Sequence, residues 1–141
     1  MDNNELRYPI LLFRDGYIFR ADNGNELLLH DKRTFDETIR GDWRVIDSVG
    51  ALFHVVEWER IPRPRGLKAF SQVLLGGIYA QPKLVSERKL TIQEFIHEIE
   101  PMLLRYRMYG NRYGDDEERF RNALKSKKTF SELYEFLESA V

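Results

Sequence analysis

The spacing of the apolar residues changes at about residue 89, and this change constrains the fold more than any other feature of the chain. Before it, short apolar runs alternate with Gly, Pro, Asn and Asp, which is typical of strands. After it, apolar residues recur every three or four positions, which is typical of amphipathic helices. No intervening stretch is long or polar enough to separate two domains. The chain of 141 residues is therefore predicted to form a single α+β domain over residues 1–141, strand-rich over 1–88 and helical over 89–141.

The strand-rich part predicts a mostly antiparallel sheet of five or six strands. Residues 10–13 and 18–21 flank Asp15-Gly16, a dipeptide that favours a hairpin with a type I′ turn. A third strand over residues 26–30 would complete a three-strand meander. Further strands are predicted at residues 43–47, 51–60 and 73–80, with 83–85 as an extension after Pro82. A Gly76-Gly77 pair in the sixth segment suggests a bulge or a close backbone approach.

The segment 51–60 carries apolar residues on both faces. Leu52, Val56 and Trp58 share one face, while Phe53 and Val55 share the other. A strand that is covered on both sides has this pattern, so a central position is expected.

Two or three helices are predicted, and their starts have a common sequence pattern. Thr91 and Thr129 each precede a Glu by three residues, as does Thr34, and Thr-x-x-Glu is the pattern of a capping box. The Thr34 box predicts a short helix over residues 34–40. The apolar stripes expected to pack on the sheet consist of Ile92, Phe95, Ile96, Ile99 and Leu103, followed by Phe130, Leu133 and Leu137.

Two segments in the helical part are expected to depart from regular helix. Pro101 should kink or end the helix that begins near Thr91, because proline lacks the N–H that the helix needs. The aromatic and Gly-rich residues 106–114 are expected to be irregular, before a helix that starts in the acidic run at Asp115.

Composition excludes several function classes. The chain has 22 Lys and Arg against 23 Asp and Glu, a net charge of −1, which disfavours a globally basic nucleic-acid binder. It has no Cys, which excludes disulfides, thiolate metal sites and cysteine nucleophiles. The first residues are polar and acidic rather than basic and apolar, and no apolar run approaches the ~20 residues that span a bilayer. A cytoplasmic protein with no membrane contact is expected.

No pattern of catalytic or cofactor-binding residues is found. The three histidines, His30, His54 and His97, lie far apart in the sequence. Glu94 and His97 match Glu-x-x-His, but a di-iron bundle needs two such motifs and two further Glu. Phosphate-binding glycine loops and nucleophile elbows are absent. We therefore expect no cofactor, no metal and no catalysis, with an unrecognised site that joins His54 or His30 to a carboxylate as the alternative.

Residues 60–68 form a basic stretch in which Arg60, Arg63, Arg65 and Lys68 are interspersed with two prolines and a glycine. It suits either a phosphate-contacting loop or a solvated connection between strands. No interleaved aromatic residues accompany it, which favours the connection. A nucleic-acid-binding module is therefore the third hypothesis for the function.

The segment 106–118 combines Tyr and Arg with an acidic run. Tyr and Arg are enriched at the energetic centres of protein interfaces. The segment suits a protein-binding edge, or a loop that its tyrosines attach to the core.

Residues 43–61, Trp-Arg-Val-Ile-Asp-Ser-Val-Gly-Ala-Leu-Phe-His-Val-Val-Glu-Trp-Glu-Arg-Ile, place a strand ending in Asp before a Gly turn and a long strand. Residues 91–99 add a capped helix. In this arrangement, and as a small chain without Cys, the protein resembles the immunity proteins of contact-dependent growth inhibition and related bacterial polymorphic toxin systems. The resemblance covers about half the chain and transfers no contact residue. It implies a cytoplasmic protein that binds and blocks one cognate toxin domain, often a nuclease, and leaves the oligomeric state open.

An immunity protein for a nuclease is expected to offer carboxylates to a cationic cleft, with aromatic residues as anchors. The predicted partner-binding residues are therefore Tyr109, Tyr113, Asp115, Asp116, Glu117 and Glu118. The second choice is the N-terminal third, because residues 1–31 carry a net charge of −3. The acidic run has another explanation, since carboxylates at a helix start also interact favourably with the helix dipole.

Overall fold

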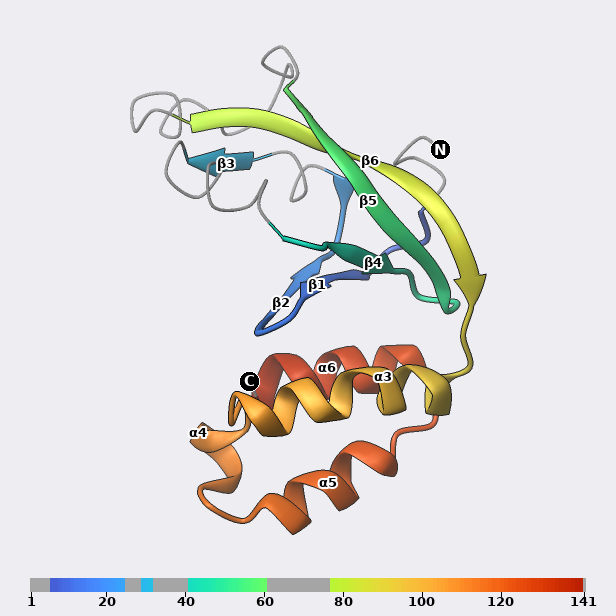
Figure 1. The fold of residues 1–141 in the computed structure, drawn as a ribbon. Helices are drawn as coiled ribbons and strands as arrows, with labels where there is room; N and C mark the ends of the chain where they lie inside the picture. The colour runs from blue at the N-terminus through green and yellow to red at the C-terminus, as the bar shows by residue number, and fades with distance from the viewer. Residues whose placement is uncertain (1–5, 25–28, 32–40, 61–76, 141) are drawn as a thin grey trace.

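The computed structural model describes residues 6–24, 29–31, 41–60 and 77–140, which form a sheet above a layer of helices (Figure 1). The strands are β1 (Ile10–Arg14), β2 (Tyr17–Ala21), β3 (Leu29–Asp31), β4 (Arg44–Ile46), β5 (Ala51–Arg60) and β6 (Gly77–Lys89). The helices are α3 (Ile92–Arg105), α4 (Gly110–Tyr113), α5 (Glu117–Lys125) and α6 (Phe130–Ala140). The predicted α+β fold class is confirmed. The helix predicted over residues 34–40 lies outside the described residues, as do residues 73–76.

All strand pairs in the sheet are antiparallel, in the order β2-β1-β4-β5-β6-β3. The predicted three-strand meander is wrong, because β3 pairs with β6 at the opposite edge from β2. Strand β1 instead lies between β2 and β4. Its apolar residues face both sides of the sheet, which suits a strand whose two faces are both covered.

The β1–β2 hairpin is confirmed, but its turn type differs from the prediction. Arg14 pairs with Tyr17, so Asp15 and Gly16 form a two-residue turn. A type I′ turn needs positive φ at both residues, whereas only Gly16 has one, at 83°. A single positive φ at the second turn residue fits a type II turn. The tip rests on the ring of Tyr106, which lies 3.3 Å from the position of a Cβ on Gly16.

Strand β6 is longer than predicted and runs through Pro82. The proline pairs with Trp58 of β5, and β3 covers only residues 77–79 on the other side of β6. Proline is tolerated in a strand where one side lacks a partner. Register shifts between Leu52 and Phe53 and between Val55 and Glu57 accompany the pronounced curvature of β5 and β6 that Figure 1 shows.

Both faces of the sheet carry a buried apolar cluster. The helix-side cluster joins Leu11, Ile46 and Leu52 of the sheet to the buried residues of α3, α5 and α6. The far-side cluster holds Trp43, Val45, Phe53 and Val55, among others. Leu52 faces the helix side and Phe53 and Val55 face the far side, so coverage of both faces is confirmed for this part of β5. The prediction that Val56 and Trp58 share the face of Leu52 is wrong, because Val56 is exposed and Trp58 packs against the far-side cluster, beyond the register shift between Val55 and Glu57.

The predicted capping of α3 is confirmed in both directions. The Glu94 N–H donates to Thr91 Oγ1 and the Thr91 N–H donates to Glu94 Oε1, at 3.2 and 3.0 Å. The helix continues through Pro101 to Arg105, so the proline does not end it. Its predicted stripe faces the sheet, and Leu133 and Leu137 of α6 join the same cluster. Helix α4 is a single turn inside the segment predicted to be irregular.

Among the described residues, no helix has the length and apolar character that a membrane span requires.

Candidate functional site

Tyr109 of the predicted partner-binding edge lies in the core. Only 5% of it is exposed, and its ring stacks on Phe120 with the ring centres 5.0 Å apart. The prediction that Tyr109 is an exposed anchor is therefore wrong. The physical reason is that α4 turns the segment back onto α5 and α6, which buries this side chain against Phe120.

Tyr113 is half-buried and also contacts the helical core. Its ring meets Phe120 and Phe136 edge-on at 5.6 and 6.0 Å. The guanidinium groups of Arg112 and Arg119 lie over it at 6.0 and 5.6 Å. Of the three tyrosines in this segment, the most exposed is Tyr106, at 47%.

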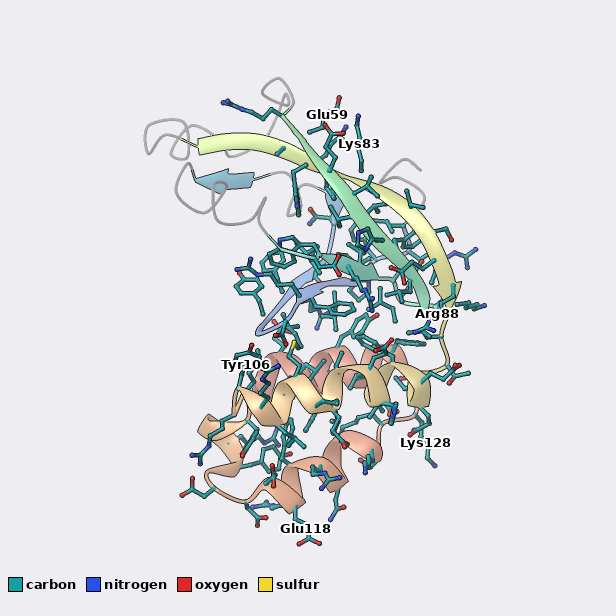
Figure 2. All side chains as sticks on the ribbon, viewed as in Figure 1. Glu59, Lys83, Arg88, Tyr106, Glu118 and Lys128 are labelled. Carbon is teal, nitrogen blue, oxygen red and sulfur yellow. The ribbon has the colours of Figure 1, made fainter. Side chains whose placement is uncertain are left out.

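The acidic run is divided between local and outward roles. Asp116 is the N-cap of α5 and accepts from the Arg119 N–H at 3.0 Å, and Asp115 contacts Arg107 at 2.6 Å. Glu117 and Glu118 occupy the first turn and are exposed. Figure 2 shows Glu118 pointing away from the molecule at the start of α5. Two of the four carboxylates thus have structural partners, and the other two face solvent.

The segment before α4 is fixed by backbone geometry as well. Arg107 has a φ of 51°, and the N–H groups of Arg107 and Met108 donate to the carbonyls of Leu104 and Leu103. This is the Schellman arrangement that ends a helix, with Arg where Gly is usual. The residues 106–118 therefore have a largely structural explanation.

The N-terminal third presents a different surface, which we call the β2 edge: the outer side of strand β2 with the exposed rings of Tyr17 and Phe19. These rings are 44% and 36% exposed. None of the other described strands pairs with the outer side of β2. Sequence analysis selected this third of the chain only as a second choice, on its charge.

The exposed ring of Tyr17 is supported by a residue of the far-side cluster. Tyr17 meets Trp43 edge-on at 5.3 Å, and the Arg14 guanidinium lies 4.8 Å from the centre of the Trp43 ring. The Tyr106 hydroxyl donates to Asp15 at 2.9 Å at the hairpin tip, and this hydrogen bond raises the pKa of Tyr106. The edge is therefore a supported surface rather than a loose hairpin.

An open pocket of about 290 Å³ lies beside β2, between the strand and α6, and we call it the notch. Its lining is about equally polar and apolar, with one charged residue of each sign at the rim. The lining residues are Leu11, Ile18, Phe19, Arg20, Tyr134, Leu137 and Glu138. The sequence holds one signal for this surface, since Tyr17, Ile18 and Phe19 place large side chains on both faces of a short strand.

His54 lies between two carboxylates on the helix side of the sheet. Its Nε2 is 3.3 Å from Asp42 and its Nδ1 is 3.5 Å from Glu87. A neighbouring pocket of about 210 Å³ is lined by Asp42, Arg44 and Glu98, with Phe13, Ile99 and Met102 as its apolar part, and also by Arg14 and Asp15. His54 itself does not line it.

The Glu94–His97 pair is not arranged as a metal site. The Glu94 carboxylate caps α3, and its hydrogen bonds with Thr91 lower the pKa of Glu94. In the described part of the chain, no group of three His, Asp or Glu residues is placed to hold a metal ion. The side chain of His30 lies outside the described ones. So do Arg63, Arg65 and Lys68 of the basic stretch, which leaves Arg60 at the end of β5.

The chain matches no family model, no curated protein and no solved structure.

Proposed function

We propose that this protein is a non-catalytic binding protein that holds a partner protein at the β2 edge. Its concrete form is an immunity protein that occludes a cognate toxin domain, with a nuclease as the main case. The observation that carries the proposal is the combination of a strand whose outer side has no partner among the described strands, two exposed aromatic rings and an adjoining notch. Aromatic side chains next to a pocket are characteristic of interface centres.

The inhibitor acts without turnover. Binding places the body of the protein over the toxin surface and excludes its substrate for as long as the complex lasts. The exposed carboxylates Glu117, Glu118 and Glu138 attract a cationic partner, which speeds association more than it strengthens the final complex. The energy of the complex comes from the aromatic rings and the notch.

The test is protection in a bacterial host. The toxic domain to express is the C-terminal domain of a large secreted protein encoded directly upstream, alone or with this chain. Co-expression should restore growth, and a toxin domain from a different system should still arrest it. Growth arrest that persists with abundant, folded protein would contradict the proposal.

Two matched substitutions locate the surface. Phe19→Ser removes an exposed ring from β2, whereas Val56→Ser removes an exposed apolar side chain from β5. Only Phe19→Ser should abolish protection. Equal protection by both variants would show that the β2 edge is not the contact surface.

A small-ligand protein is the second candidate function, favoured by the pocket between β1, β4 and α3. The Arg44 guanidinium is half-buried there and lies 3.7 and 3.8 Å from Glu87 and Glu98, beyond hydrogen-bond distance. An Arg in that position suits a carboxylate ligand. A thermal-shift screen of small carboxylates and amino acids tests this function. A compound that stabilises the wild type but not Arg44→Gln would support it.

A further inference from the structure

The outer side of β2 presents backbone groups in a regular pattern. Because the pair Arg14–Tyr17 closes a two-residue turn, hydrogen-bonded and non-hydrogen-bonded pairs alternate from that point along the hairpin. The alternation directs the N–H and C=O groups of Tyr17 and Phe19 toward β1, and those of Ile18 and Arg20 outward. An extended segment that pairs with the outward groups would continue the sheet.

This edge carries little of the usual protection against strand addition. Edge strands are commonly blocked by charged side chains, Pro or a bulge. Strand β2 contains no Lys and no Pro, its one charged residue, Arg20, is paired with Asp22 and Glu138, and its five residues pair with β1 in continuous register. Strand β6 shows the contrast, because Pro82 and a register shift lie along its length.

The notch defines one side chain of the segment that would add to β2. The pocket opens between Ile18 of the strand and Leu137 of α6, with Tyr134 in its lining. Side chains of an added strand alternate between the two faces of the sheet, so one of them would point toward α6. The apolar part of the lining, Leu11, Ile18 and Leu137, suits a single large apolar side chain at that position.

The charges at the rim of the notch define a second side chain of the added segment. Arg20 donates to Asp22 at 2.9 Å and to Glu138 at 2.8 Å. Burial lowers the pKa of Arg20, but these two carboxylates outweigh burial and raise it. The side chains of Asp22 and Glu138 are 57% and 63% exposed, against 27% for Arg20. The exposed carboxylate of Glu138, beside a less exposed guanidinium, favours a basic residue on the partner.

We infer that β2 receives an extended segment of the partner protein as an added strand, with a large apolar side chain in the notch and a Lys or Arg beside Glu138. The inference rests on the proposed function for the identity of the partner, and on the β2 edge for the mode of binding. It names the recognised chemistry as a short extended peptide rather than a folded surface.

Two substitutions at one position test the backbone contact. Arg20→Pro and Arg20→Ala both remove the guanidinium, but only the proline also removes the outward N–H. Proline is tolerated where the strand N–H faces away from its partner, so the β1–β2 pairing should survive. We expect binding to weaken at least tenfold more in Arg20→Pro than in Arg20→Ala. Equal binding by the two folded variants would overturn the inference.

The probe is a library of displayed random twelve-residue peptides, selected on the wild-type chain after depletion on Arg20→Pro. Selected peptides should share a large apolar residue two positions away from a Lys or Arg, because both side chains must point toward α6. They should bind Glu138→Lys at least tenfold more weakly than the wild type. Glu118→Lys, the matched charge reversal on α5, should bind them as the wild type does. If Arg20→Pro does not fold, the library is depleted on Glu138→Lys instead. Binding of the selected peptides to Glu138→Lys and to Glu118→Lys then tests the inference.

Three results would overturn the inference: no enriched peptide, peptides that depend on Glu118 rather than Glu138, or a dimer of the chain that Arg20→Pro dissolves. The last would mean that β2 pairs with a second copy. Because the selection needs no toxin, a failed protection experiment with successful peptide selection refutes the immunity function alone. Successful protection with failed selection refutes the added strand alone.

Discussion

Gly50 occupies the most restricted backbone position in the turn between β4 and β5. Its φ is 89°, and a Cβ there would overlap the Leu90 carbonyl oxygen and the Phe130 ring. The Leu90 N–H also donates to the Gly50 carbonyl at 2.8 Å, so the turn anchors the chain where it enters α3.

Gly50→Ala should therefore lower the free energy of unfolding by about 3 kcal/mol or more, combining left-handed strain with steric overlap. Gly114→Ala is the control. Its φ is 57° and nothing lies within 4 Å of the added methyl group, so it should cost only about 1–2 kcal/mol. Urea unfolding measures both, and equal losses would show that the contacts around Gly50 do not restrict it.

Tyr134 joins α6 to the end of β4 through a buried hydroxyl. The hydroxyl donates to the Asp47 carbonyl at 2.7 Å, and Asp47 Oδ1 in turn accepts from the N–H groups of Val49 and Ala51. Burial, and secondarily the charge of Asp47, raise the pKa of Tyr134 above its ordinary value near 10.

The raised pKa makes stability fall at high pH. Below about pH 10 the hydroxyl is protonated in both states, and above it only the unfolded state ionises, so the free energy of unfolding decreases. Tyr134→Phe should cost about 1–2 kcal/mol at pH 8. Its deficit should shrink by pH 10.5. Urea unfolding of both proteins at the two pH values measures this, and a constant deficit would place Tyr134 in contact with solvent.

At the scale of single elements, helix α5 shows how one acidic run serves two purposes. Asp116 satisfies a backbone N–H at the helix start, whereas Glu117 and Glu118 only add favourable charge near the dipole. A charge reversal that included Asp116 would therefore confuse helix capping with partner binding.

We expect Asp116→Ala to lower the free energy of unfolding by about 1 kcal/mol and to leave partner binding unchanged. Glu117→Gln with Glu118→Gln should cost less than about 1 kcal/mol and slow association with a cationic partner. Thermal unfolding and stopped-flow association measure the two effects. If Asp116→Ala alone slowed association, residues 109–118 rather than the β2 edge would be the contact surface.

The sequence predicted the elements better than their arrangement. Strand β5 and the Thr91 capping box followed from local patterns, because alternation and caps depend on neighbouring residues. The position of β3 did not, since its pairing with β6 depends on a contact distant in sequence. The burial of Tyr109 was missed for the same reason: its partner Phe120 lies on the next helix. Predicting that β2 lies at an edge of the sheet would have required the strand order, which no local sequence pattern contains.

On the scale of the whole molecule, the sheet connects two buried clusters. Trp43 belongs to the far-side cluster and Trp58 packs against it, while Ile99 lies in the helix-side cluster. Tryptophan fluorescence therefore reports one face of the sheet, and far-UV circular dichroism reports the helices packed on the other.

Ile99→Ala should lower the free energy of unfolding by about 2–5 kcal/mol. Because both clusters share strands β1, β4 and β5, the fluorescence and dichroism transitions should shift together in urea. Separate transitions would show that the two faces of the sheet unfold independently.

Hydrogen exchange by mass spectrometry on the complex tests the central claim most directly. The complex is formed with the toxin domain that the proposed function assigns as partner, and the comparison is the free chain at the same pH. Binding along the β2 edge predicts slower exchange in peptides that cover residues 17–21, where the Ile18 and Arg20 amides gain partners. Slower exchange confined to residues 109–118, with β2 unchanged in a saturated complex, would contradict the claim.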